Sequence, residues 1–325
     1  MRMFRRAVLA AALATATLAQ TPALAQTWPD KPVRIVTPFA AGGLANNLAR
    51  VLADGLTQRL GQAVIVEPKP GGGGVIAFQA VKNAPPDGNT LLLGTNSTLT
   101  LLPLMQKNLP FDGLKDFEPV AITFVGGNLI VVREDSPIKS FADLRAQSRT
   151  KPNALTYGSA GNGTTFHLMP AMFDRLNGSS MVHVPYRGGS PAFMGLLAGE
   201  TSLIFGNTDA LPFVKAGKLR PIAAMSPKRL SYLPEVPTTA ELGMPELVME
   251  SFYGLLAPVG TPKPIVDRLN KEVTELLATP TVRKQLETLA IDPAGNTSPA
   301  YFRQQIQSEL ARWRPVITDA NITAE

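Results

Sequence analysis

Cysteine is absent from this 325-residue sequence, and histidine occurs only twice, at His167 and His183. Without cysteine the chain has no disulfide framework, no thiolate metal site and no acceptor for a lipid. Two isolated histidines without an acidic cluster do not predict a catalytic metal either. We therefore expect no metal ion and no cofactor, and the sequence offers no residue pair that would act as nucleophile and base.

Long apolar runs are also missing beyond the N-terminus. Residues 1–26 have a basic start, an Ala/Leu-rich stretch and the small-residue site Ala23-Leu24-Ala25, which is the layout of a secretory signal peptide. We expect residues 1–25 to be removed and the remaining chain to work in the periplasm. The alternative is that residues 7–19 stay as an anchor, but they fall short of the roughly 20 apolar residues that a spanning helix needs.

Charge of one sign is not concentrated anywhere along the chain. Three of the 31 Lys and Arg residues and none of the 25 Asp and Glu residues lie in the leader, so its removal lowers the formal charge from +6 to +3. The basic residues are dispersed among acids and do not cluster with aromatic residues, as a nucleic-acid surface would require. The sequence predicts no nucleic-acid partner.

The chain instead alternates short apolar runs, turns rich in Gly and Pro, and helical stripes. Residues 33–37 are typical of a buried strand, and leucine then recurs every four residues from Leu44 to Leu60. The expected elements of the N-terminal part are strands at 33–37, 63–66 and 90–93 and helices at 44–60 and 75–83. This alternation predicts an α/β fold with mainly parallel sheets, in which ligands bind at the carboxyl ends of strands.

A second series of the same kind follows. It contains expected strands at 129–132, 154–158, 181–185, 203–205 and 221–225, and helices at 141–147, from 164, and at 191–198. The tail adds a strand at 251–257 and helices at 262–277, 281–289 and 299–317. We interpret this order as two α/β lobes, one built from residues 26–124 and 250–325 and the other from residues 125–249. The tail helices are expected to pack on the first lobe.

Two loops between a strand and a helix are candidate anion sites. Residues 38–43 (PFAAGG) can turn their backbone N–H groups and the following helix amino end toward an anion. Residues 157–167 (YGSAGNGTTFH) hold the same position in the second lobe and add hydroxyl groups that can bind a carboxylate. Glycines 71–74 offer a weaker, third opportunity. The alternative for Gly42 and Gly43 is that they only permit a tight turn.

The same loops give less support to an enzymatic function than to anion binding. Glu67 ends its strand as a ribose-binding acid would, but no G-x-G-x-x-G run opens the first helix, so a dinucleotide site is not predicted. A serine nucleophile elbow needs G-x-S-x-G, and Tyr157 stands at the first glycine position. His167 is expected either to contact a ligand or to pack against its loop, and His183 is expected to be structural.

A series of short motifs, taken together, resembles a known family. They are WPDKPVR at 28–34, PFAAGG at 38–43, LGQ at 60–62, VEPKPGGGG at 66–74, PDG at 86–88, DFEPV at 116–120, the 157–167 loop, HVPYRGG at 183–189, AGKLR at 216–220 and PEVPT at 234–238. In this order they resemble the Bug-type, tricarboxylate-binding receptors of tripartite tricarboxylate transporters. The resemblance covers essentially the whole chain after the leader.

The resemblance implies a type II periplasmic-binding-protein fold whose two lobes close on a small carboxylate, and it implies integral-membrane permease subunits as partners. Carried over by motif, the ligand-binding residues would be Phe39, Ala41, Gly42, Gly43 and Asn46 in the first lobe and Ser159, Gly163, Thr164, Thr165 and His167 in the second. Phe252 stands where relatives often carry tryptophan near the cleft. Asn46 stands where relatives usually carry Asp; it can cap the helix amino end, but it removes a negative charge beside the pocket.

The leading hypothesis is therefore a periplasmic solute receptor without enzymatic activity, expected to be a monomer. One alternative is a sensor subunit that uses the same cleft but reports its closed form to a signalling kinase. Another is an enzyme on a similar scaffold, which would need a nucleophile and a base in the cleft. The sequence does not name the solute.

Overall fold

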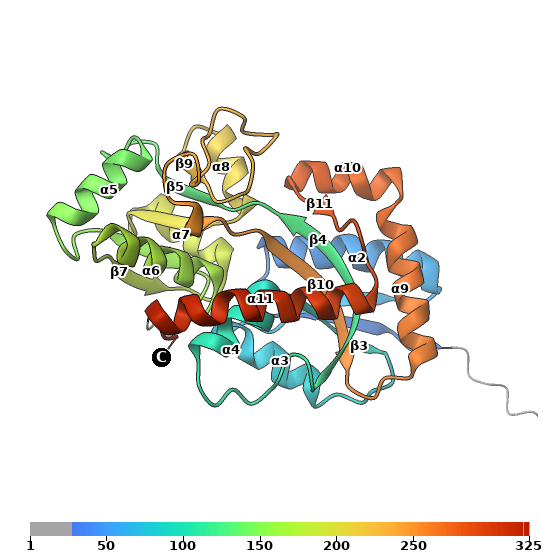
Figure 1. The fold of residues 1–325 in the computed structure, drawn as a ribbon. Helices are drawn as coiled ribbons and strands as arrows, with labels where there is room; N and C mark the ends of the chain where they lie inside the picture. The colour runs from blue at the N-terminus through green and yellow to red at the C-terminus, as the bar shows by residue number, and fades with distance from the viewer. Residues whose placement is uncertain (1–27, 321, 325) are drawn as a thin grey trace, which may run out of the picture.

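The computed structural model describes residues 28–320 and 322–324, so the expected leader at 1–25 lies outside the described residues. Two β-sheets, each covered by helices, lie side by side (Figure 1). Within the described ranges, no helix combines the length and the apolar character needed to cross a membrane.

The first sheet has six strands in the order β11-β4-β10-β3-β1-β2. Its strands are β1 (Val33–Thr37), β2 (Val64–Pro68), β3 (Thr90–Thr95), β4 (Phe117–Gly126), β10 (Ser251–Pro258) and β11 (Asp292–Pro293). Its helices are α2 (Leu44–Leu60), α3 (Val75–Lys82), α4 (Leu102–Met105), α9 (Lys263–Leu277), α10 (Pro280–Leu289) and α11 (Pro299–Ala320), and a short helical segment, η2 (Ser97–Leu101), precedes α4.

The second sheet has five strands in the order β7-β6-β8-β5-β9. Its strands are β5 (Leu129–Arg133), β6 (Thr156–Ser159), β7 (Val182–Pro185), β8 (Leu203–Gly206) and β9 (Leu219–Ala224). Its helices are α5 (Phe141–Thr150), α6 (Thr165–Asn177), α7 (Gly189–Ala198) and α8 (Leu211–Lys215), with the short turn η3 (Thr208–Ala210) before α8. The α/β class predicted from the sequence is confirmed.

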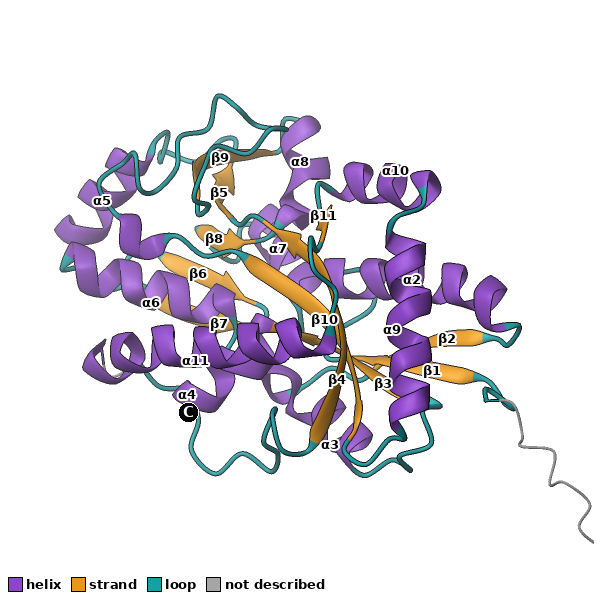
Figure 2. Ribbon diagram, turned by 45° about the vertical axis from the view of Figure 1, so that its right-hand side comes forward, coloured by secondary structure: helices purple, strands orange, loops and turns teal. Residues whose placement is uncertain are grey.

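The prediction of mainly parallel sheets was wrong. In each sheet one strand pairs in parallel with two neighbours, β1 with β2 and β3 and β6 with β7 and β8, but the remaining pairs are antiparallel. The reason lies in the connection between the sheets. The chain leaves the first sheet along β4 and returns along β10, and these two strands therefore pair antiparallel from Phe117↔Pro258 to Gly126↔Ser251 (Figure 2).

The leucine stripe of α2 positions the amino end of this helix at the edge of its sheet. Leu48, Leu52 and Leu56 are fully buried, as the four-residue spacing predicts. α9 packs closely beside α2 at Gly55. The absence of a side chain there leaves room for Leu276 of α9, which a Cβ would overlap. The helix ends at Gly61, whose left-handed backbone lets its N–H bond the carbonyl of Thr57.

The C-terminal helix α11 reaches further than the sequence predicts. Near its start, Arg303 donates to the carbonyl of Leu114, as expected for a helix on the first lobe. Near its end, Arg175 of α6 donates to the carbonyl of Asp319. Its 22 residues span about 33 Å, enough to run along both lobes (Figure 1).

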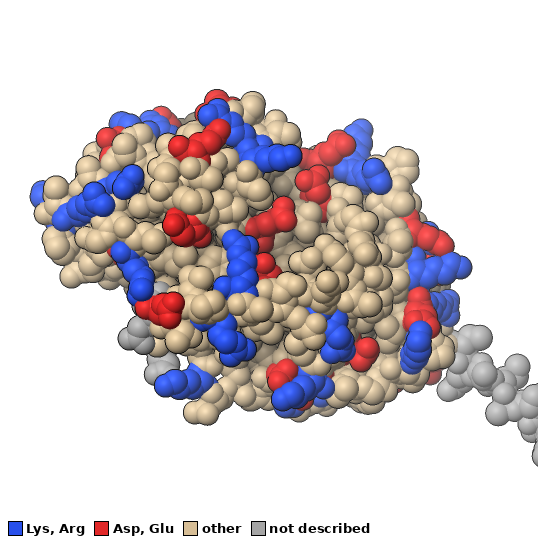
Figure 3. Space-filling model, viewed as in Figure 1, with Lys and Arg blue, Asp and Glu red and all other residues tan. Residues whose placement is uncertain are grey.

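Charged side chains of both signs are interspersed on the face seen in Figure 3, and none gathers into a single-sign patch. The structure pairs charges of opposite sign elsewhere in the same way, for example Arg59 with Glu272 at 2.7 Å and Lys82 with Asp116 at 2.9 Å. This face does not present the basic surface that binding to nucleic acid requires.

Gly254 of the central strand β10 provides a test of the core packing. An alanine Cβ there would overlap the ring of Phe302 and would lie 2.9 Å from the carbonyl oxygen of Ala121, and Phe302 is fully buried. We expect Gly254→Ala to lower the free energy of unfolding by about 1–3 kcal/mol, because neither neighbour can move away freely. Gly295→Ala, where no atom lies within 4 Å, is the control and should change stability by less than about 0.5 kcal/mol in urea denaturation. Equal effects would contradict the packing described.

Candidate functional site

Loops that follow strands of the two sheets meet at the boundary between the lobes. Three backbone N–H groups donate hydrogen bonds between them: Ala40 N–H to the Arg187 carbonyl at 3.1 Å, Thr165 N–H to Ser97 Oγ at 3.0 Å, and Leu44 N–H to Asp209 Oδ2 at 2.9 Å. Each of them links a first-lobe loop to a second-lobe loop. The structure therefore shows the lobes in contact, in a closed arrangement.

A small polar cavity lies inside this boundary. Its lining residues are Phe39, Gly43, Leu44, Ala45, Thr95, Asn96, Ser97, Ala160, Thr164, Thr165, Phe166, Gly189, Asn207, Asp209, Ser251 and Tyr253. The cavity has a volume of about 40 Å³. Because one water molecule takes about 30 Å³ of the liquid, the lobes must move apart to admit an organic ligand.

A larger hollow of about 510 Å³ lies next to this inner cavity. It is bounded by Pro38 and glycines 71–74 from the first lobe and by Gly161, Asn162 and Arg187 from the second. Phe39 and Ala160 line both hollows. We call the inner cavity and this outer hollow together the cleft.

The first-lobe loop is held by the side chain of Asn46, which is 1% exposed. Its amide donates to the carbonyls of Phe39 at 2.9 Å and Ala40 at 2.8 Å, and its Oδ1 accepts from the hydroxyl of Thr37 at 2.8 Å. An aspartate could not donate these two bonds and would place its charge against two carbonyl oxygens. Asn46 thus clamps the loop and caps no helix N–H group, which corrects the expected capping role.

The amino end of α2 is occupied by a carboxylate from the other lobe. Gly43 precedes the helix without a side-chain cap, and the N–H of Leu44, the first helical residue, bonds Oδ2 of Asp209. Asp209 is partly buried, and burial is the main cause that raises its pKa to about 6. A helix amino end is a favourable place for an anion, and here the chain supplies one.

The second-lobe loop is held by its own hydroxyl groups. Thr164 Oγ1 donates to the carbonyl of Gly161 at 2.7 Å, and Ser159 Oγ accepts from the Gly161 N–H at 3.1 Å. Thr165 begins α6, and its hydroxyl lies 2.7 Å from that of Ser97 across the boundary. The loop therefore presents one hydroxyl directly to the opposite lobe.

Three stacked rings support this loop from behind. His183 lies between Tyr157 and His167, with ring centroids 4.9 Å and 4.2 Å away. Ser159 Oγ bonds Nε2 of His183 at 2.6 Å, and Nδ1 of His167 accepts from the Gly163 N–H at 3.3 Å. Burial lowers the pKa of each histidine to about 4, so both rings are neutral at neutral pH.

Comparison with known proteins identifies the family. The family model described as the tripartite tricarboxylate transporter family receptor matches residues 48–322. The chain belongs to this receptor family. It is 33% identical over 319 residues to Protein BugT of Bordetella pertussis, covering 96% of each chain.

Two solved structures show the same fold. The periplasmic binding protein BugD superposes with a TM-score of 0.88 at 30% identity, over 92% of this chain and 100% of that one. Rpa4515 of R. palustris, solved with adipate, superposes with a TM-score of 0.87 at 33% identity, over 91% and 99% of the chains. The receptor therefore has the periplasmic-binding-protein fold of its family.

The structure does not bring the ten predicted site residues of the receptor together in one place. Phe39, Gly43, Thr164 and Thr165 line the inner cavity. Asn46, Ser159, Gly163 and His167 are absent from the linings of both hollows, and three of them make the loop contacts described above: Asn46 in the first-lobe loop, and Ser159 and His167 in the second. Gly42 faces a separate hollow beside α7 and α8, and Ala41 is exposed. Phe252, which was expected near the cleft, packs against Phe302 instead.

Sequence reasoning missed the polar residues that follow β3 and β8. Asn96, Ser97, Asn207 and Asp209 all line the inner cavity. The signal that could have found them is their position, because ligands in α/β sheets bind at the carboxyl ends of strands. These residues contain no glycine run of the kind on which the predicted site rests.

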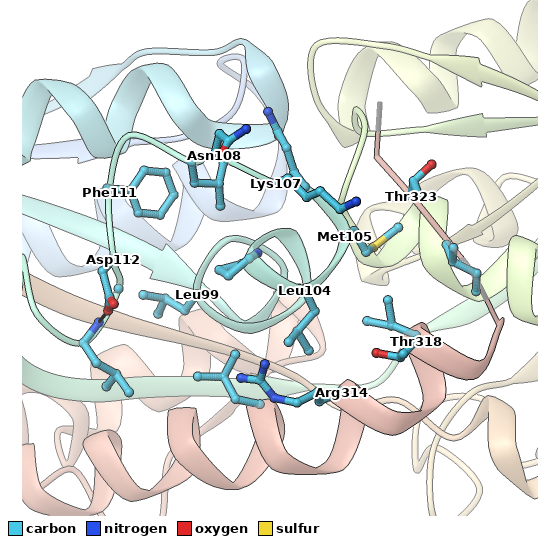
Figure 4. Close-up of a pocket in the computed structure, with 18 residues that line it drawn as sticks. Leu99, Leu104, Met105, Lys107, Asn108, Phe111, Asp112, Arg314, Thr318 and Thr323 are labelled. Atoms are coloured by element: carbon cyan, nitrogen blue, oxygen red, sulfur yellow. Dashed lines mark hydrogen bonds between the residues drawn. The ribbon is translucent and has the colours of Figure 1, made fainter.

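Another hollow of the receptor lies away from the cleft. It has a volume of about 780 Å³ between the segment 103–114 and the end of α11. Figure 4 shows Arg314 and Thr318 of α11 on one side and Lys107 and Asn108 on the other. None of its lining residues comes from the second-lobe sheet or its loops, so closure of the lobes does not form it. Among the described residues, no group of three or more His, Asp or Glu side chains could hold a metal ion.

Gly73, within the glycine run 71–74, lets the lobes approach each other closely. Gly73 has φ of +63°, and a Cβ there would overlap the carbonyl oxygen of Asn162 from the second lobe. We expect Gly73→Ala to prevent full closure, which should weaken ligand binding at least about tenfold and expand the ligand-bound protein in small-angle X-ray scattering. Gly61→Ala, with φ of +68° and no atom within 4 Å, introduces the same backbone strain as the control. Equal loss of affinity in both variants would contradict this role.

The lowered pKa of His167 predicts a pH-dependent stability. The unfolded chain binds a proton near the ordinary pKa of about 6.5, whereas the folded ring binds it only near pH 4. The stabilisation is thus present above pH 6.5 and lost as the pH falls toward 4, with about 2 kcal/mol lost between pH 7 and pH 5. His167→Asn keeps an acceptor near the position of Nδ1 without titrating, and should have a smaller loss in urea denaturation at the two pH values. An undiminished loss in the variant would contradict the assignment.

Proposed function

We propose that the receptor captures a small organic carboxylate in the cleft and delivers it to the membrane permease of a tripartite tricarboxylate-type transporter. The observation that carries the proposal is that the amino end of α6 and the hydroxyls of Ser97 and Thr165, from opposite lobes, meet at one cavity. Helix amino ends and hydroxyl groups bind carboxylates without a fixed opposing charge. The adipate bound in the relative Rpa4515 supports the same ligand class.

Closure supplies the binding energy in this proposal. In an open form the hydroxyls of Ser97 and Thr165 would face separate surfaces, whereas in the closed form they lie 2.7 Å apart. A carboxylate that touches both loops stabilises the closed form alone, and a ligand shifts an equilibrium only through such a difference. β4 and β10, the paired strands that join the sheets, are the natural hinge.

We place the lobe boundaries at residues 26–124 with 250–325 and at 125–249, because the strands divide between the two sheets near these positions. In the same proposal residues 1–25 direct export to the periplasm and are then removed. The closed, joined lobes would be the surface that the permease recognises. The receptor would act as a monomer that binds and releases its solute without chemical change.

A thermal-shift screen of residues 26–325 with mono-, di- and tricarboxylates tests the binding. Ligand at 100 times its dissociation constant should stabilise the protein by about 2.7 kcal/mol, a shift of a few degrees. Thr165→Val removes the hydroxyl that faces Ser97 and should reduce the shift, while Thr150→Val, at an exposed helix end, should not. No shift with any acid, in protein freed of co-purified ligand, would refute carboxylate capture.

Delivery is tested separately by co-purification from membranes with the ligand present. Recovery of permease subunits that depends on ligand supports transport. Recovery of a signalling kinase in their place would make the protein a sensor subunit.

A further inference from the structure

Asp209 is the one charged side chain among the residues that line the inner cavity. No described Lys, Arg or His forms an ion pair with it; its Oδ2 accepts a hydrogen bond from the backbone of Leu44. It follows β8 in the turn η3, and its own N–H is held by Oδ1 of Asn207 at 3.0 Å. The carboxylate is thus fixed in the cleft without a cationic partner from the protein.

The surroundings of Asp209 leave little room for a second anion. Its Oδ2 lies close to two glycines, since a Cβ at Gly189 would be 3.4 Å away and one at Gly43 would be 3.6 Å away. Burial raises its pKa to about 6, and its charge contributes to raising the pKa of Tyr253, another residue of the lining. Burial of each side chain is the main cause of both pKa shifts, and the charge of Asp209 adds to the second.

A ligand that places a second carboxylate against Asp209 therefore matches this end of the cleft poorly. One carboxylate could bind the hydroxyls of Ser97 and Thr165, but a second would compete with Asp209 for the amino end of α2 and repel it. A ligand ammonium group would reverse both effects, because its three N–H groups need acceptors. Asp209 and the hydroxyl of Tyr253 are acceptors in the cavity lining.

We propose that Asp209 determines the specificity of the receptor and that the ligand is a carboxylic acid that also bears an ammonium group, with the ammonium against Asp209. This inference rests on the proposed function and narrows its substrate class. The negative charge that the first-lobe loop lacks at Asn46 is supplied in this chain by the opposite lobe. The bound zwitterion bridges the lobes, with its carboxylate at the paired hydroxyls and its ammonium at Asp209.

The test compares acids that differ only in the amino group. Isothermal titration with aspartate and succinate, glutamate and glutarate, and 2-aminoadipate and adipate gives a preference for each pair. The wild-type receptor should bind the better amino acid about tenfold or more tightly than its partner acid, since one charge-assisted hydrogen bond is worth at least this factor. Asp209→Asn keeps an acceptor for Leu44 and should abolish or reverse the preference. Asp54→Asn, an exposed position on α2, is the control for charge and should leave it unchanged.

The outcomes separate the two proposals. Binding of the plain acids without any advantage of the amino acids in the wild-type receptor would overturn the role of Asp209 and leave carboxylate capture standing, whatever the stability of the variant. A preference that survives in Asp209→Asn would also overturn it. Absence of binding by all six acids and by the wider carboxylate screen would refute carboxylate capture, and the role of Asp209 with it.

Discussion

The direct contact of backbone with backbone across the lobe boundary is the constraint on which the rest of the structure depends. Gly73 approaches the carbonyl of Asn162 so closely that no side chain fits between them, and Ala40 bonds the carbonyl of Arg187. Glycine-rich loops after the strands are therefore needed on both sides. Their flexibility must in turn be removed, because loose loops would lose entropy on every closure. Asn46 in one lobe and the Tyr157–His183–His167 stack in the other hold them in place.

The parts of the fold that the sequence predicted are those whose cause is local. The leucine stripe of α2 repeats with the helical period, and the strand at Val33–Thr37 is bounded by turn residues on both sides. The long strand β4 and the antiparallel return of β10 were not predicted as a pair, because their register depends on residues about 130 positions apart. The segment Ser97–Leu101 was missed for a related reason, since its buried surface faces α11 and its polar end faces the other lobe.

The candidate site divides in the same way. Phe39, Gly43, Thr164 and Thr165 could be predicted because each belongs to a loop with a visible glycine pattern, and all four line the inner cavity. His167 and Ser159 belong to the same pattern but form the support behind the loop, which only the direction of their side chains reveals. No sequence motif marks Asp209 as a site residue. Its partner, the backbone of Leu44, lies 165 positions earlier, so its place in the cleft follows from the closed tertiary structure alone.

The charge of the cleft follows from Asn46 and Asp209 taken together. The first-lobe loop needs a donor at position 46 to bind its two carbonyls, and an amide supplies it without charge. The amino end of α2 is left with an unpaired N–H group, which favours an anion. Asp209 provides that anion from the opposite lobe and so tightens the closed form, but it also leaves one uncompensated negative charge inside. An electrically neutral site then requires the missing positive charge to arrive with the ligand.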